Sequence, residues 1–294
     1  MADSTTLHQG LRVVAAPHPG RRVATLSVGM IVFALLYVLL TNPNFQWPVV
    51  GKYLFSMTVL KGLGVTIWLT FVAMSIGLVI GILLAVMRLS ESPVIKASSS
   101  AYLWFFRGTP VLVQLIFWYN LAIVFPALVL KVPFGPELYR ASTNDLISPY
   151  VAAVLGLSLN EGAYLAEIVR AGILSIDDGQ YDAARALGLR RGQVLRRVIL
   201  PQAMRVIVPP VGNQTIGMLK LTSLVSVVAM SDLLYSVQGI YGRTFETVPL
   251  LLVACVWYLV ATSILTVIQG RIERHYAKGR RNGGQPSFKI RGGR

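Results

Sequence analysis

Two long apolar runs without a single charged residue constrain this chain most strongly. They cover Val65–Met87 and Val248–Ile268, which are 23 and 21 residues long. A helix rises about 1.5 Å per residue, so each run is long enough to cross the hydrocarbon core of a bilayer, about 30 Å thick. The mean hydropathy of +0.63 and the 13% content of charged residues also lie outside the range of ordinary soluble domains. The sequence therefore predicts a polytopic membrane protein.

Four further apolar segments bring the expected number of spans to six. One of them, Val206–Met230, contains Pro209 and Pro210, which predict a kinked or divided helix. The run Val23–Thr41 is long for a secretory signal and lacks a small-residue cleavage site after it, so we interpret it as a retained first helix. The remaining two segments are Val111–Leu130 and Val151–Leu174. The predicted fold class is all-α, a transmembrane bundle of about six helices.

The formal net charge of +15 follows the expected topology. If six spans place both termini in the cytoplasm, 19 Lys and Arg residues fall in cytoplasmic segments and 4 in outer loops. The connection from Arg88 to Arg107 counts as cytoplasmic in this topology. An excess of positive residues in cytoplasmic loops is the usual orientation signal, and the basic tail after Ile268 suits a position near anionic lipid. Membrane lipid, rather than nucleic acid, therefore accounts for the charge.

A polar, arginine-rich insert, residues 175–201, separates two apolar segments. Asp177 and Asp178 can cap a helix that begins near Gly179, and Gly188 is well placed to end it. The short side chains of Ala183 and Ala184 make one part of this helix thin. The helix could therefore lie in a groove of a soluble partner. An ordinary solvated helix in a loop would show similar charge patterning.

The pattern of this insert resembles the EAA loop of ABC importer permeases. The resemblance rests on Asp182-Ala183-Ala184, on Gly188 and on Ile199-Leu200-Pro201. Three other segments resemble the branch of that family that imports polar amino acids. They are FRGTPVLVQ at Phe106–Gln114, SLNEGAYLAEIVRAGI at Ser158–Ile173 and LPQAMRVIVPPVGNQ at Leu200–Gln214.

The resemblance extends from about Tyr53 to Lys278 and has two departures. Asp182 stands where the motif most often has Glu, which keeps the charge but shortens its reach. The helix Val23–Thr41 is additional to the five helices of the smallest permeases in this branch. The expected domains are thus residues 1–58, with an N-terminal tail and the extra helix, the permease core 59–272, and a basic tail 273–294 that we expect to be disordered.

The resemblance implies a larger assembly. It predicts two cytoplasmic ATPase subunits, an external solute-binding protein and a second permease subunit, which is either an identical copy or a related chain. The loop 175–201 would dock on the ATPase. The residues assigned to this coupling contact are Tyr181, Asp182, Ala183, Ala184, Leu187, Gly188 and Pro201.

Polar residues in the segment Val151–Leu174 form a first candidate for the substrate path. Asn160, Tyr164 and Glu167 are spaced to share one helix face, with Glu161 beside them. Intramembrane carboxylates are costly, so each should face protein or water. Glu167 could pair with Arg170, three residues later. Glu161 could meet a substrate ammonium group, or it could pair with Lys220 and only hold helices together.

The segment Val206–Met230 is the second candidate, because it is the most polar of the six. An unwound Pro-Pro-Gly stretch could present backbone groups to a zwitterion, as discontinuous helices do in transporters. Hydrogen bonding between helices would explain its amides equally well. The full set assigned to the substrate path is Asn160, Glu161, Tyr164, Asn213, Gln214, Lys220, Thr222 and Ser223.

Motifs for catalysis are missing from the sequence. There is no G-x-x-x-x-G-K-[ST] motif, so a partner chain must bind and hydrolyse the ATP. The three histidines, His8, His18 and His275, fall in the predicted tails, which argues against a catalytic triad, a metal site or a bound cofactor. We therefore predict a bacterial inner-membrane permease subunit of an ATP-driven importer for polar amino acids, with no enzymatic activity of its own. An ABC permease for another small solute, a passive channel and a membrane scaffold are the alternatives.

Overall fold

The computed structural model describes residues 19–132 and 136–277, and the chain divides into two compact units at Trp47. The first unit holds helix α1 (Pro19–Thr41) and the short 3-10 helix η1 (Pro43–Phe45). After η1 the indole nitrogen of Trp47 donates to the carbonyl oxygen of Leu39 at 3.1 Å. No residue of the span 23–41 is buried within the described structure, as a helix surrounded by lipid allows. The expected tail segments 1–18 and 278–294 lie outside the described residues.

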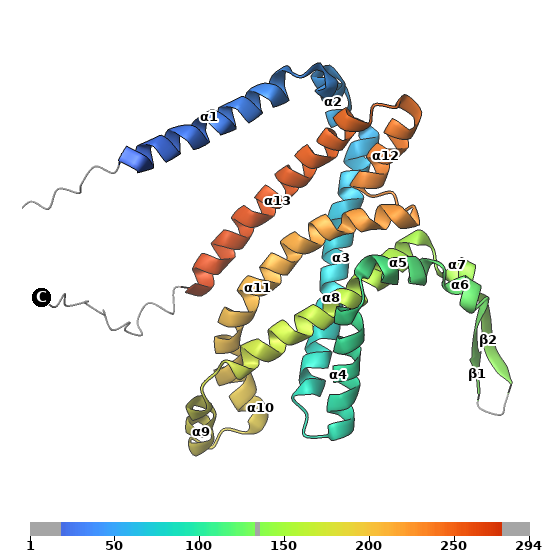
Figure 1. Ribbon diagram of the computed structural model, residues 1–294. Coiled ribbons are helices and arrows are strands. Elements are labelled where there is room, and N and C mark those ends of the chain that lie inside the picture. Colours follow the sequence, from blue (N-terminus) through green and yellow to red (C-terminus); the bar gives the residue numbers. More distant parts are fainter. Residues whose placement is uncertain (1–18, 133–135, 278–294) are drawn as a thin grey trace, which may run out of the picture. The chain divides into compact units, whose positions relative to one another are not determined.

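The second unit begins in α2 (Trp47–Leu54) and is built around α3 (Met57–Arg88) and α8 (Pro149–Leu174), which cross and pack against each other (Figure 1). Ser56 and Ser148 cap the two helices, because each hydroxyl accepts a hydrogen bond from the backbone nitrogen three residues later. Both expected spans, Val65–Met87 and Val151–Leu174, lie inside these helices.

Small residues allow α3 and α8 to approach closely. Ala73, Gly77, Gly81 and Ala85 recur every four positions on α3, and all four are buried. A Cβ atom added at Gly81 would lie 2.8 Å from the Cβ of Leu165 and 3.0 Å from the backbone nitrogen of Ala166. A side chain at this position would therefore push the two helix backbones apart.

The predicted continuous span Val111–Leu130 is wrong. Helix α4 (Pro93–Gly108) is followed by α5 (Val111–Tyr119), whose nine residues extend about 14 Å, and by the single turn α6 (Leu121–Val124). The side chain of Asn120 donates to the carbonyl of Ile116 at 2.8 Å where α5 ends. The strands β1 (Ala127–Lys131) and β2 (Glu137–Ser142) then form an antiparallel hairpin, followed by α7 (Thr143–Leu146).

The next segment of the chain reaches from the polar insert into the bundle. Helices α9 (Asp178–Ala186) and α10 (Arg191–Val194) and the π-helical turn η2 (Leu195–Ile199) precede α11 (Leu200–Leu221). The 3-10 helix η3 (Thr222–Val228), α12 (Leu233–Thr244) and α13 (Thr247–Ala277) complete the fold. The last helix includes residues 273–277, so this part of the tail that was expected to be disordered is helical.

The sequence predicted a kinked or divided helix at Pro209 and Pro210, and a division is not found, because α11 continues through both prolines. Helix α13 supplies a polar group there, since the side-chain nitrogen of Gln269 donates to the carbonyl of Pro209 at 2.9 Å. Gly212 makes room for this amide, because a Cβ atom at that position would lie 1.6 Å from its oxygen. The chain breaks later, in η3, and bends by 46° before α12. A neighbouring helix can thus hold a proline-containing helix intact.

Within the described residues, four helices are long and apolar enough to cross a membrane, or five if the bent segment Arg191–Thr244 counts as one span. The all-α, multi-pass class is confirmed. The expected six spans are not reached, because the stretch from Val111 to Leu130 is divided among α5, α6 and β1.

Candidate functional site

A cavity of about 550 Å³ lies between the end of α4, the start of α5, the middle of α8 and α11. Four of the eight residues predicted for the substrate path line it. Two of them are almost fully buried, since Asn160 and Glu161 are 6% and 4% exposed. Tyr164 follows one turn later on α8, and Gln214 faces α8 from α11. The structure therefore joins the two polar segments that sequence alone only placed on separate helices.

The carboxylate of Glu161 is held by a side-chain amide. The nitrogen of Gln214 donates to Oε1 of Glu161 at 3.1 Å, and Oε2 accepts no hydrogen bond from any residue that the structure describes. Gly77 of α3 passes close behind, because a Cβ atom there would lie 3.2 Å from the Cβ of Glu161. The carboxylate thus lines the cavity with one oxygen free for a ligand.

An amide network fixes the rest of the wall. The side-chain nitrogen of Asn160 donates to the carbonyl of Phe106 at 2.8 Å and to Oε1 of Gln114 at 3.2 Å. The side-chain nitrogen of Gln114 in turn donates to the hydroxyl of Thr109 at 2.6 Å. These bonds hold the α4–α5 connection against α8, so the network is most simply a positioning device.

Arg107 is a residue of this cavity that the sequence analysis missed. It was placed in a cytoplasmic connection, whereas it lines the same cavity as Glu161. Its guanidinium lies 5.5 Å from the centre of the Tyr164 ring, within the range of a cation–π contact. Arg107 is the second residue of the motif FRGTPVLVQ, and this motif was the sequence signal that could have identified it. The cavity consequently carries a cation as well as an anion.

Four predicted path residues do not line this cavity. Asn213 and Lys220 are exposed on α11. Thr222 and Ser223 lie in η3, where their hydroxyls donate to the carbonyls of Leu219 and Lys220, at 2.7 Å in each case. The proposed pair between Glu161 and Lys220 is wrong, because the described residues contain only two ion pairs, Glu137–Arg140 and Glu167–Arg170. The expected pairing of Glu167 with Arg170 is confirmed.

The second part of the candidate site is the polar insert, where α9 forms as predicted. The carboxylate of Asp177 accepts a hydrogen bond from the backbone nitrogen of Gly179 at 2.8 Å and caps the helix. Gly188 ends the helix with a φ of +75°, and its backbone nitrogen donates to the carbonyl of Arg185 at 2.8 Å. The sequence located both ends because the cap and the left-handed glycine are local signals.

The predicted coupling residues divide between an inner and an outer face of this insert. Ala184 is buried against Val194 and Ile199, with Tyr181 packed at the edge of this small core. Burial raises the pKa of the Tyr181 hydroxyl, and the nearby Asp178 carboxylate adds to the rise. The exposed members are Asp182, Ala183, Leu187, which is 81% exposed, and Gly188. Pro201 lies in the first turn of α11.

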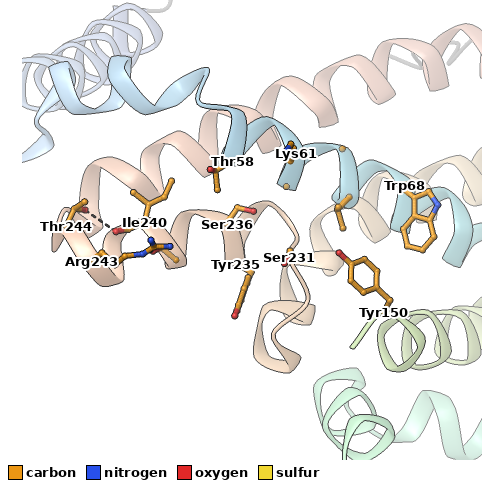
Figure 2. A pocket seen from close by; sticks show the side chains of 14 residues that line it. Thr58, Lys61, Trp68, Tyr150, Ser231, Tyr235, Ser236, Ile240, Arg243 and Thr244 are labelled. Atoms are coloured by element: carbon orange, nitrogen blue, oxygen red, sulfur yellow. Dashed lines mark hydrogen bonds between the residues drawn. The ribbon is translucent and has the colours of Figure 1, made fainter. Parts of the chain in front are cut away.

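Figure 2 shows a further cavity, of about 950 Å³, between the first turns of α3, the start of α8 and α12. Lys61, Tyr150 and Arg243 are among its lining side chains. None of the residues predicted for the substrate path belongs to its lining in the described structure. This cavity is therefore separate from the one that contains Glu161.

Comparison with known proteins decides the family. Residues 77–278 match the family described as binding-protein-dependent transport system inner membrane component. The chain belongs to this family. The arginine transport system permease protein ArgU of Corynebacterium glutamicum is 44% identical over 269 residues, which cover 89% of this chain and 82% of that protein.

Solved structures agree with the family. A crystal structure of an amino acid ABC transporter with histidines is 36% identical, with a TM-score of 0.63, and the match covers 74% of this chain and 94% of that chain. A bacterial alginate ABC transporter in complex with a pentasaccharide-bound periplasmic protein shares the fold at 14% identity and a TM-score of 0.54, over 87% and 96% of the two chains. This protein is thus a multi-pass permease subunit of the inner membrane, and such subunits have no catalytic site of their own.

Proposed function

We propose that this permease carries an amino acid with a cationic side chain, and that the cavity around Glu161 lies on its path. The observation that carries the proposal is the buried carboxylate of Glu161, with one oxygen free toward the cavity. A buried carboxylate is costly without a cationic partner, and the structure offers it only an amide. The α-ammonium group of an amino acid or a cationic side chain would supply the missing charge, and the choice of a cationic side chain rests on the relatives.

The second charge of the cavity suits the other end of such a substrate. Arg107 lines the wall on the α4–α5 side, and a guanidinium is well suited to bind a carboxylate in two-pronged geometry. A volume of about 550 Å³ is enough for one amino acid. The relatives support this assignment, because one is described as an arginine permease and another as an amino acid transporter with histidines.

Energy would come from a partner ATPase that docks on residues 175–201. The support is the exposed surface of α9 and of its C-cap residue Leu187, where Asp182 and Ala183 are also exposed above a small packed core. The side chain of Gln202 on α11 donates to the side-chain oxygen of Gln180 on α9 at 3.3 Å. This contact links α9 to the first turn of α11, and α11 carries Gln214 in the cavity wall further along. ATP can drive the switch between outward and inward access only if the ATP-loaded ATPase binds one of these two permease conformations more tightly than the other.

The remaining assignments complete the proposal. Both termini lie in the cytoplasm, which requires α4 and α5 together to make one crossing in addition to the five candidate spans. The core 59–272 carries transport, while 1–58 and 273–294 flank it. Two permease subunits, two ATPases and an external solute-binding protein form the working complex. The description of the family as binding-protein-dependent supports the last of these partners.

The test compares Glu161→Gln with Asn213→Ala in the reconstituted complex. A charge-assisted hydrogen bond is worth about 1.5 to 3 kcal/mol, so we expect Glu161→Gln to lower kcat/KM for arginine uptake about tenfold or more. Asn213 is exposed outside the cavity, and its variant should transport normally. Both variants should assemble with the ATPase. Normal arginine uptake by assembled Glu161→Gln would show that this carboxylate is not on the path.

A further inference from the structure

Three arginines of the insert meet at one cavity of about 680 Å³ between α10 and η2. Arg190, Arg196 and Arg197 line it together with Gly192 and Gln193. Among the residues that the structure describes, no carboxylate belongs to this lining. Arginine remains protonated at every physiological pH, so the cavity concentrates three positive charges.

These charges are uncompensated within the described structure. The two ion pairs there involve other arginines, Arg140 and Arg170. Two acidic residues of the insert, Asp178 and Asp182, line a different cavity together with Tyr181. Like charges gathered on one wall repel one another, and a bound anion would relieve this repulsion.

A packed scaffold holds the arginines in place. Val194 and Ile199, five residues apart, are both buried in the core of the insert, because the i→i+5 pattern of η2 brings them to the same face. Arg196 and Arg197 lie between them and are exposed on the opposite side. The backbone nitrogen of Arg190 donates to Oε1 of Gln193 at 2.9 Å, which fixes the other wall.

The surroundings favour a lipid. Leu195 and Leu200 are 46% and 40% exposed, so apolar side chains flank the arginines just before α11 enters the bundle. Guanidinium groups bind phosphate in two-pronged geometry, and a mixed basic and apolar surface beside a membrane helix attracts anionic headgroups. We propose that Arg190, Arg196 and Arg197 bind the phosphate of an anionic phospholipid. This site is independent of the substrate proposed above.

The experiment measures lipid retained by the full chain in detergent, by native mass spectrometry, with equal amounts of phosphatidylglycerol and phosphatidylcholine. The test variant combines Arg190→Gln, Arg196→Gln and Arg197→Gln. The control removes three exposed cations elsewhere, Lys52, Lys96 and Arg243, also by change to Gln. We expect the wild-type and control chains to retain phosphatidylglycerol preferentially, and the test variant to retain at least about threefold less.

Two further arms separate the alternatives. Inorganic phosphate at millimolar concentration should leave the bound lipid in place, whereas its displacement would show a site for a soluble anion and overturn the lipid assignment. Size-exclusion chromatography and thermal unfolding in detergent report that the variants are folded, and pull-down of the co-expressed ATPase is measured separately. A test variant that loses the ATPase but retains phosphatidylglycerol would show that the arginines contact the ATPase instead. Equal lipid retention by all three chains would likewise overturn the proposal.

Discussion

At the scale of single residues, sequence reasoning located the groups that carry charge and missed the geometry that relates them. Glu161 was singled out because a carboxylate inside an apolar segment is costly. Its partner, however, is Gln214, 53 residues away, rather than Lys220. Arg107 was overlooked because its place beside Tyr164 depends on how α4 turns into α5, which periodicity does not encode.

Gly188 yields a prediction at this scale. Its φ of +75° costs a β-branched residue about 1 to 2 kcal/mol, whereas asparagine tolerates this region. We expect Gly188→Val to shift the end of α9 and lower ATP-dependent uptake several-fold, and Gly188→Asn to stay close to the wild type. The readouts are uptake and ATPase pull-down. Equal activity of the two variants would show that the left-handed turn does not matter for coupling.

At the scale of elements, predictions held where one local signal decided the structure. The long apolar runs became α3, α8 and α13, and the caps fixed α9. They failed at the segments Val111–Leu130 and Val206–Met230. In the first, α5 ends at Asn120, whose side chain donates to the carbonyl of Ile116, and in the second, the side chain of Gln269 on α13 donates to the carbonyl of Pro209. Such tertiary effects cannot be derived from one segment alone.

The contact between α3 and α8 gives the corresponding prediction. Gly81→Ala would place a Cβ atom 2.8 Å from Leu165 and 3.0 Å from a backbone nitrogen of α8, and overpacking of this kind costs about 1 to 3 kcal/mol. We expect a lower midpoint of thermal unfolding in detergent. The control is Gly64→Ala, since Gly64 on the same helix has open space around it. If the midpoint falls equally in both variants, the lost stability comes from replacing any glycine of α3, and not from the contact between α3 and α8.

At the scale of the whole molecule, the distribution of charge predicts the topology. With both termini in the cytoplasm, most of the positive residues lie on the inner side, as orientation requires. A reporter that is active only in the cytoplasm should therefore be active when fused to either end, and inactive when inserted between β1 and β2. Reporter activity at that hairpin would contradict this topology, because residues 175–201 would then lie outside the cell, where the ATPase could not reach them.

The central claim is that this chain imports a cationic amino acid with energy from a separate ATPase. It is tested most directly by uptake of labelled arginine, histidine, glutamine and glutamate into proteoliposomes that contain the permease, its ATPase and its solute-binding protein. We predict uptake that requires enclosed ATP and favours arginine or histidine. Uptake without ATP would indicate a channel. ATP-dependent uptake of glutamate in preference to arginine would contradict the assignment of a cationic substrate.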